Sequence, residues 1–142
     1  MRIAVGSDHA GLHLKNLLAE HLREQGFEVL DLGCMDVASV DYPDYARLVA
    51  KNVASGEADS GLLVCGTGQG MAMTANRIRG IRASVCSDTY SARATREHND
   101  SNVLCLGQRV VGDGLAREIV DAWVHAVFLG GRHQKRVEKI EG

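Results

Sequence analysis

Residues 60–70 read SGLLVCGTGQG, an apolar run that ends in one thiol and continues directly into a loop with glycine at every second position. The run over 60–66 is short, continuous and bounded by turn residues, which favours a strand that is buried on both faces. A helix is expected to follow the loop, over about 70–77. A strand, a glycine loop and a helix in this order are typical of an α/β fold with a parallel sheet.

The same alternation of strand and helix patterns extends along the whole chain. Further strands are expected at 2–6, 27–33, 82–86 and 103–107. Further helices are expected from the leucines at 14, 17, 18 and 22 up to Gly26, from Pro43 to Gly56, and at 89–97 and 113–128. A basic segment, 131–141, ends the chain and is expected to be helical. The pattern predicts a single-domain, doubly wound (Rossmann-like) parallel sheet of about five strands with helices on both faces.

Composition limits the class of protein. The chain has 142 residues, 45% of them hydrophobic and 24% charged, which fits one globular domain over 1–142. A net charge of −2 gives no footprint for nucleic acid or an anionic membrane surface. No apolar stretch reaches the roughly 18 residues that span a bilayer, and the first residues lack a signal-peptide layout. A cytoplasmic protein with no membrane partner is therefore expected.

The four cysteines, Cys34, Cys65, Cys86 and Cys105, show neither C-x-x-C spacing nor histidines at zinc-ligand spacing. Free thiols and no metal site are expected. A cysteine is most often a small buried hydrophobe, and this interpretation suffices for Cys86 and Cys105. Cys65 differs because it ends a strand and faces the start of a helix, an environment that favours a thiolate acting as nucleophile or base.

Ligands of doubly wound sheets bind outside the carboxyl ends of the strands. Three polar segments are expected there: GSDHAG at 6–11, CGTGQG at 65–70 and REHNDSN at 96–102. The first contains Asp8 and His9, and the last contains His98 and Asn99, which are groups suited to acid–base work and hydrogen bonding. Each of these two pairs is equally consistent with a helix cap.

The glycine loop has G-x-G-x-G spacing, which fits neither the dinucleotide fingerprint nor a Walker loop. Exposed amides at the start of a helix suit an anion or a developing oxyanion, and a tight strand-to-helix turn is the alternative. A phosphatase C-x5-R loop would need arginine where the chain has Met71, which argues against covalent phosphoryl chemistry.

Arg132 and Arg136 are four residues apart, so a helix would place them on one face, where they could grip a phosphate. A solvated basic tail is the alternative. The phosphate interpretation gains weight because the glycine loop is a second anion-directed feature of the same chain. A phosphorylated small molecule is therefore the expected ligand.

Seven motifs, in their order and spacing, resemble the type B ribose-5-phosphate isomerases of the ribose/galactose isomerase family nearly end to end. They are GSDHAG at 6–11, DYPDYA at 41–46, CGTGQG at 65–70, ANRIRGIRA at 75–83, EHNDSNVL at 97–104, GQRVVG at 107–112 and GGRHQKRV at 130–137. The resemblance implies an aldose–ketose isomerase that interconverts ribose 5-phosphate and ribulose 5-phosphate through a cis-enediolate, without metal or organic cofactor.

In that family a cysteine at the position of Cys65 removes the proton from C2 of the sugar and returns it to C1. Thr67 would orient the thiol or the substrate, while His98 and Asp8 would open the sugar ring. Members that lack the cysteine use a glutamate at the position of Met71, so this chain resembles the cysteine branch.

The resemblance also implies binding roles for the other residues of these motifs. The phosphate would be bound by His9, Arg109, Arg132 and Arg136, the charge on oxygen by the amides from Gly66 through Gly68 to Gly70, and the open chain by Asn99, with Tyr42 and His133 lining the pocket. Gln69 stands where the branch often has a small apolar residue. A six-carbon substrate, allose 6-phosphate or galactose 6-phosphate, is therefore the alternative.

Type B isomerases form homodimers with shared active sites, and a tetramer is the alternative assembly. By this resemblance one chain would supply Asp8, Cys65 and the glycine loop, and the partner would supply His98, Asn99 and Arg109. The competing class is a non-catalytic nucleotide or flavin binding module on the same architecture. The low aromatic content, 4%, counts against it, because few rings are available to stack on a base or flavin.

Overall fold

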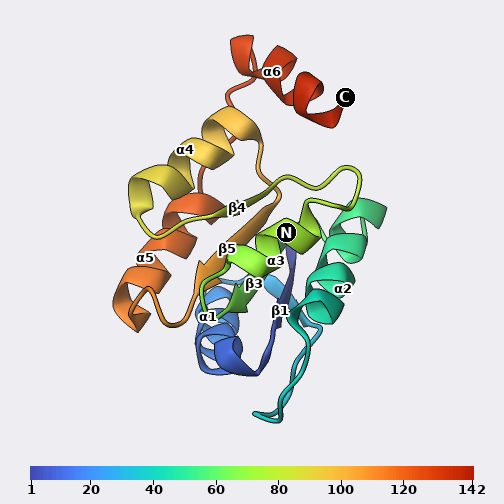
Figure 1. Cartoon of the computed structure of the whole chain (residues 1–142). Helices are drawn as coiled ribbons and strands as arrows, with labels where there is room; N and C mark the ends of the chain where they lie inside the picture. The colour runs from blue at the N-terminus through green and yellow to red at the C-terminus, as the bar shows by residue number, and fades with distance from the viewer.

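The computed structural model describes all residues, 1–142, and confirms the expected α/β class (Figure 1). The strands are β1 (Arg2–Ser7), β2 (Glu28–Asp31), β3 (Ser60–Cys65), β4 (Ala83–Val85) and β5 (Val103–Gly107). The helices are η1 (His9–Gly11, a 3-10 turn), α1 (Leu12–Glu24), α2 (Tyr42–Ser55), α3 (Gln69–Ala75), α4 (Thr89–Asn99), α5 (Asp113–Val124) and α6 (Arg132–Glu141). No helix is both long enough and apolar enough to cross a bilayer.

All five strands are parallel and lie in the order β2-β1-β3-β5-β4. The chain first moves from β1 to β2 on one side and then returns to place β3 on the other side of β1. The strand order therefore reverses between β1 and β3, where Ser7 lies opposite Val64. The segments that follow these two strands leave the sheet side by side, which makes this edge the expected ligand position.

Alternate residues of the central strands point to opposite faces of the sheet. Leu62 and Val64 of β3 pack into the core that α1 and α5 cover. Leu63 and Cys65 pack into the core that α2 and α3 cover. The thiol at the end of β3 therefore faces the α2–α3 side.

Several of the expected elements end earlier than the sequence pattern indicates, among them α3, which ends at Ala75, and β4, which ends at Val85. The last long helix, expected over 113–128, ends at Val124. The apolar periodicity continues to Val127, but that residue is 71% exposed, and the chain leaves the helix to reach α4, where Leu129 N–H donates to the Glu97 carbonyl. The second strand, expected over 27–33, is shorter because β2 lies at the sheet edge with β1 as its one partner.

Most residues of helix α6 are exposed, and Val137 is its one buried residue. It packs against α4, and Arg82 forms an ion pair with Glu141 at its end. Figure 1 shows α6 at the end of the molecule opposite to the edge where β1 passes into α1. The two arginines of α6 are thus separated from the carboxyl ends of the strands within one chain.

Candidate active site

A cavity of about 390 Å³ lies at the carboxyl ends of β1 and β3, where the strand order reverses. Its lining consists of Asp8, His9, Ala10, Tyr42, Cys65, Gly66, Thr67, Gly70 and Arg109. Four separate segments of the chain therefore meet here: the turn after β1, the start of α2, the glycine loop and the turn after β5. Eight of these nine residues, all except Ala10, were expected from the sequence to belong to the site.

Cys65 is the last residue of β3, and its residue surface is 6% exposed. Its Sγ accepts a hydrogen bond from the Gly68 N–H at 3.1 Å. Gly68 can place its N–H there because it adopts a left-handed conformation with φ of 81°, which favours glycine. An amide that donates to the sulfur at the start of a helix stabilises negative charge on that sulfur.

The other thiols lack this environment, although all four cysteines are free as expected. Burial, with the charge of Asp88 adding to it, raises the pKa of Cys86 to about 11. Burial also raises the pKa of Cys105, which is completely enclosed within β5. These two thiols are neutral at physiological pH and act as core residues.

The glycine loop uses part of its amide groups internally. The Gly68 N–H donates to Cys65, and the Gln69 N–H donates to the Thr67 hydroxyl oxygen at 3.3 Å. The N–H groups of Thr67 and Gly70 have no acceptor within the chain. Gly68 is buried, the side chain of Gln69 is exposed, and neither lines the cavity, in contrast to the sequence expectation.

Tyr42 forms a wall of the cavity by packing its ring on the backbone of Gly70. A Cβ atom at Gly70 would collide with Cε1 of that ring. The glycine is therefore needed for the close approach of Tyr42. The contact between Tyr42 and Gly70 joins the start of α2 to the glycine loop.

Asp8 and His9 have defined partners at the turn after β1. The Asp8 carboxylate is buried, caps η1 by accepting the Gly11 N–H at 3.0 Å, and also lines the cavity. The His9 Nδ1 accepts the Val40 N–H at 3.1 Å, so the ring proton lies on Nε2. Asp8 is therefore both a helix cap and a residue of the cavity.

Arg109 follows β5 and extends over the glycine loop of its own chain. Its Nη1 lies 3.2 Å from the position that a Cβ atom would take on Gly66. It therefore lines the cavity with Cys65 of the same protomer. The expectation that Arg109 reaches this site from a partner chain is wrong, because β5 ends at the same sheet edge as β3.

A second cluster of expected site residues lies on α4 and α6. The rings of His98 and His133 are stacked, with centroids 4.5 Å apart and planes 15° apart. Arg132 and Arg136 flank them on α6. Desolvation holds the pKa of His133 below its ordinary value, and the charges of His98, Arg132 and Arg136 lower it further. This α4–α6 cluster concentrates positive charge that suits a phosphate.

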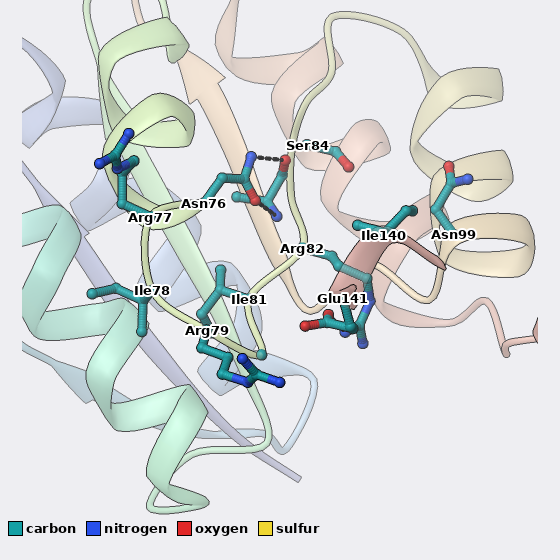
Figure 2. Close-up of a pocket in the computed structure, with 12 residues that line it drawn as sticks. Asn76, Arg77, Ile78, Arg79, Ile81, Arg82, Ser84, Asn99, Ile140 and Glu141 are labelled. Atoms are coloured by element: carbon teal, nitrogen blue, oxygen red, sulfur yellow. Dashed lines mark hydrogen bonds and ion pairs between the residues drawn. The ribbon is translucent and has the colours of Figure 1, made fainter. Parts of the chain in front are cut away.

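Asn99 follows His98 but lines a different cavity, of about 440 Å³, between the loop before β4 and the end of α6 (Figure 2). The expectation that residues 96–102 lie at the carboxyl edge of the sheet is wrong. Helix α4 runs back across the sheet, so its last turn brings the chain to the beginning of β5 rather than to a strand end. Neither Asn99 nor any of the four residues of the α4–α6 cluster lines the Cys65 cavity.

Two polar residues that the sequence does not single out make long-range contacts in this part of the fold. Gln108 donates its backbone N–H to the Cys65 carbonyl at 2.9 Å, and its side-chain oxygen accepts the Leu14 N–H at 2.9 Å. Lys15 is completely buried and binds Asp31. Lys15 stands among the leucines of the inner face of α1, and a lysine at such a position is the sequence signal that could have indicated a buried ion pair.

Comparison with known proteins agrees with this geometry. The family model described as Ribose/Galactose Isomerase matches residues 3–140. Ribose-5-phosphate isomerase B of Escherichia coli is 55% identical over 139 residues, which cover 98% of this chain and 93% of that protein.

Two solved structures extend the likeness to the fold. Ribose-5-phosphate isomerase B of Clostridium thermocellum has a TM-score of 0.98 at 53% identity, covering 99% of this chain and 95% of that chain. The enzyme of the same name from Mycoplasma genitalium, with bound ribulose-5-phosphate, has a TM-score of 0.94 at 44% identity, covering 99% and 93%. A match of this extent leaves one conclusion: the chain belongs to the ribose/galactose isomerase family.

Proposed function

We propose that the protein interconverts D-ribose 5-phosphate and D-ribulose 5-phosphate through a cis-enediolate, with Cys65 as the base. The observation that carries this proposal is the Cys65 thiol at the point where the strand order reverses, with an amide hydrogen bond to its sulfur. The similarity to isomerases named for this reaction, one of them with bound ribulose-5-phosphate, supports the choice of substrate.

The proton balance of the reaction needs one base and a place for negative charge. The Cys65 thiolate takes the proton from C2 of the open-chain aldose, and the C2–H electron pair forms the C1–C2 double bond. The carbonyl electron pair moves to the oxygen on C1, to which the free N–H groups of Thr67 and Gly70, two residues of the cavity lining, would donate. The proton of the C2 hydroxyl then passes to the oxygen on C1, so that the negative charge moves to the oxygen on C2. The thiol returns its proton to C1, where the electron pair of the C1–C2 double bond forms the new C–H bond. The electron pair on the C2 oxygen forms the carbonyl, which leaves a ketone at C2 and a hydroxyl at C1.

The sugar ring must open before this step, because the cyclic form has no carbonyl group. We assign one of the two proton transfers to Asp8, whose carboxylate lines the cavity. His98 would perform the other transfer. The two transfers are the removal of the proton from the C1 hydroxyl and the addition of a proton to the ring oxygen. Thr67 would orient the thiol or the substrate from the same loop.

His98 cannot reach the cavity of its own chain in the arrangement of Figure 1, because the α4–α6 cluster lies at the opposite end of the sheet. We therefore propose a homodimer in which the cavity of one protomer faces the α4–α6 cluster of its partner. His9 and Arg109 would bind the phosphate from the cavity side. Arg132 and Arg136 of the partner subunit would bind it from the other side, and Asn99 of the partner subunit would hold the open chain.

A five-carbon substrate is favoured over a six-carbon one. Gln69, the residue that would indicate a longer sugar, is exposed and does not line the cavity. The residue therefore gives no support for a different substrate length.

Incubating the protein with ribose 5-phosphate carrying deuterium at C2 tests the proposal. We expect ribulose 5-phosphate to form, with part of the label on C1 and part exchanged with solvent. Allose 6-phosphate and galactose 6-phosphate, assayed in parallel, should turn over more slowly. Tight retention of a nucleotide or flavin without turnover of any sugar phosphate would instead favour the binding module.

A further inference from the structure

Lys15 is a buried charge outside the cavity whose contacts lead to a residue of the site. It lies on α1, its side chain is completely buried, and its ammonium group donates to three oxygens. Two belong to the Asp31 carboxylate, at 2.9 and 2.8 Å, and the third is the Cys34 carbonyl oxygen, at 2.9 Å. All three N–H donors of the ammonium group are therefore used.

These contacts lie at the beginning of segment 32–41, which connects β2 to α2. Two backbone hydrogen bonds also hold this beginning: the Ser7 N–H donates to the Gly33 carbonyl at 2.7 Å, and the Cys34 N–H donates to the Ser7 carbonyl at 2.9 Å. Asp31 is the last residue of β2, and its Oδ1 also accepts the Gly33 N–H at 3.0 Å. Lys15 thus joins the end of the strand to the third residue beyond it. A buried ion pair is weak evidence for stability, since apolar side chains of the same size often serve equally well, but it specifies one conformation of the chain.

The other end of the same segment contacts the cavity. The Val40 N–H donates to His9 Nδ1 at 3.1 Å, and Tyr42, two residues later, forms a wall of the cavity. Between the two ends the segment has no helix or strand and projects beyond the sheet (Figure 1). Met35 and Val37 are 70% and 78% exposed, so little packing holds the middle of the segment.

We propose that Lys15 is a positioning residue for the isomerisation. By joining Asp31 to the Cys34 carbonyl it sets the path of segment 32–41, and the Val40 N–H at the far end of that path fixes the tautomer and orientation of His9. The consequence for the reaction rests on the proposed function, whereas the consequence for the His9 ring does not.

The tautomer matters because the two ring nitrogens of His9 have different tasks. With Nδ1 accepting from Val40, Nε2 carries the proton and can donate it in a hydrogen bond to a phosphate oxygen in the cavity. Without that contact the neutral ring can place its proton on either nitrogen and can rotate. Substrate binding would weaken, while the base, Cys65, would stay in place.

A double substitution, Lys15→Met with Asp31→Leu, removes the tie without leaving an unpaired charge in the core. Lys15→Met alone would leave the Asp31 carboxylate without its partner and would unfold the protein more readily. Leu18→Ala is the matched control, because Leu18 is a completely buried residue of the same helix that belongs to the core rather than to segment 32–41. Thermal unfolding of both variants measures how much stability each one loses, which separates a general loss of stability from an effect on His9.

The first readout is the ¹⁵N chemical shifts of the His9 ring in labelled protein without substrate. We expect one tautomer, protonated at Nε2, in the wild type and in Leu18→Ala, and a mixture of tautomers in the double variant. A single Nε2-protonated tautomer in the double variant would overturn the proposal, whatever the activity of the protein.

The second readout is the steady-state kinetics with ribose 5-phosphate. We expect the KM of the double variant to rise about tenfold, the factor for one lost hydrogen bond to a charged group, with kcat within about threefold of the Leu18→Ala value. Equal KM values in the two variants would contradict a role in positioning. If the wild type failed to isomerise any sugar phosphate while the His9 shifts changed as expected, the proposed function would fail and the positioning of His9 by Lys15 would stand.

Discussion

The Cys65 cavity and the α4–α6 cluster are built by different means on the same chain. The cavity is formed by turns at strand ends, where backbone amides and a buried thiol are held by the sheet. The cluster consists of long cationic side chains and two stacked histidines on the outer surface of two helices. The first arrangement gives accurate placement of a few groups, and the second gives a concentration of charge.

Under the proposed function this difference matches a division of work between Cys65 as the base and the cluster arginines as phosphate ligands. A proton transfer depends on distances of a few tenths of an ångström, which strand ends can fix. Phosphate contacts are largely shared by the ground state and the transition state, so they contribute chiefly to binding. Substitutions of Cys65 and the glycine loop should therefore lower kcat, and substitutions of the cluster arginines should chiefly raise KM. His98 is the exception within the cluster, because its proposed task is a proton transfer.

The largest effect is expected for Cys65→Ala. Removing the base should lower kcat by about 10²–10⁴-fold while the affinity for the phosphate stays nearly unchanged. Cys86→Ala is the matched control, because Cys86 is a buried thiol outside the cavity, and its kcat should remain close to that of the wild type. A Cys65→Ala variant with near-normal kcat would remove Cys65 from its proposed role.

A smaller loss is expected for Gly70→Ala, which leaves every proposed catalytic side chain in place. The new methyl group would collide with the Tyr42 ring and displace it from the glycine loop. A displacement on the order of 1 Å can lower the rate by about 10²-fold, and we expect kcat/KM to fall by up to that factor. Gly114→Ala meets no neighbouring atom and serves as the control. Equal kinetics for the two variants would show that Tyr42 adapts freely.

Arg132→Ala and Arg136→Ala should each raise the KM for ribose 5-phosphate by about tenfold or more, with a modest fall in kcat. Lys135→Ala removes a charge from the same helix next to these arginines and should change KM far less. Each arginine variant should also discriminate less well between ribose 5-phosphate and free ribose than the wild type does. Undiminished discrimination in either variant would show that α6 does not bind the phosphate.

The smallest effect concerns the titration of His133 in the α4–α6 cluster. Because its pKa is held below the ordinary value of about 6.5, an NMR titration should show a midpoint below that value. Arg132→Ala should move the midpoint upward, and so should binding of inorganic phosphate to the wild type. If neither change moved the titration midpoint, the charges of the cluster would not act on His133.

The same shift has a consequence for stability, with a defined sign. In the window between the folded pKa and about 6.5 the unfolded chain binds more protons at His133 than the folded chain does. The free energy of unfolding should therefore fall as the pH falls through this window and level off below it. The His133→Gln variant should lack this component of the pH dependence, which urea titrations at several pH values can measure.

The fold and the cavity half of the site were largely predictable from the sequence. Strand-end motifs such as 60–70 specify both the buried strand and the chemistry that follows it, because the carboxyl ends of parallel strands share one edge. For that reason Asp8, Cys65 and the glycine loop were expected together and lie together. The expected ends of helices were less accurate, since packing rather than periodicity ended α5 at Val124.

The other half of the site could not be placed from the sequence. His98 and Asn99 precede a strand, and their position depends on the direction in which α4 crosses the sheet. The family resemblance places Arg109 in the site of a partner chain, but the end of β5 brings it to Cys65 of its own chain. The contacts of Lys15 join segments that are distant along the chain, and no periodicity reports such a contact.

In the proposed homodimer, the cavity of one protomer works with the α4–α6 cluster of the other. Mixing the Cys65→Ala and His98→Asn variants, each expected to be nearly inactive, tests it directly after unfolding and joint refolding. Random pairing makes half of the dimers mixed, and each mixed dimer has one intact site of two, so about a quarter of wild-type activity should return. Activity no greater than the sum of the two separate variants, with subunit exchange confirmed by mass labels, would contradict the shared site.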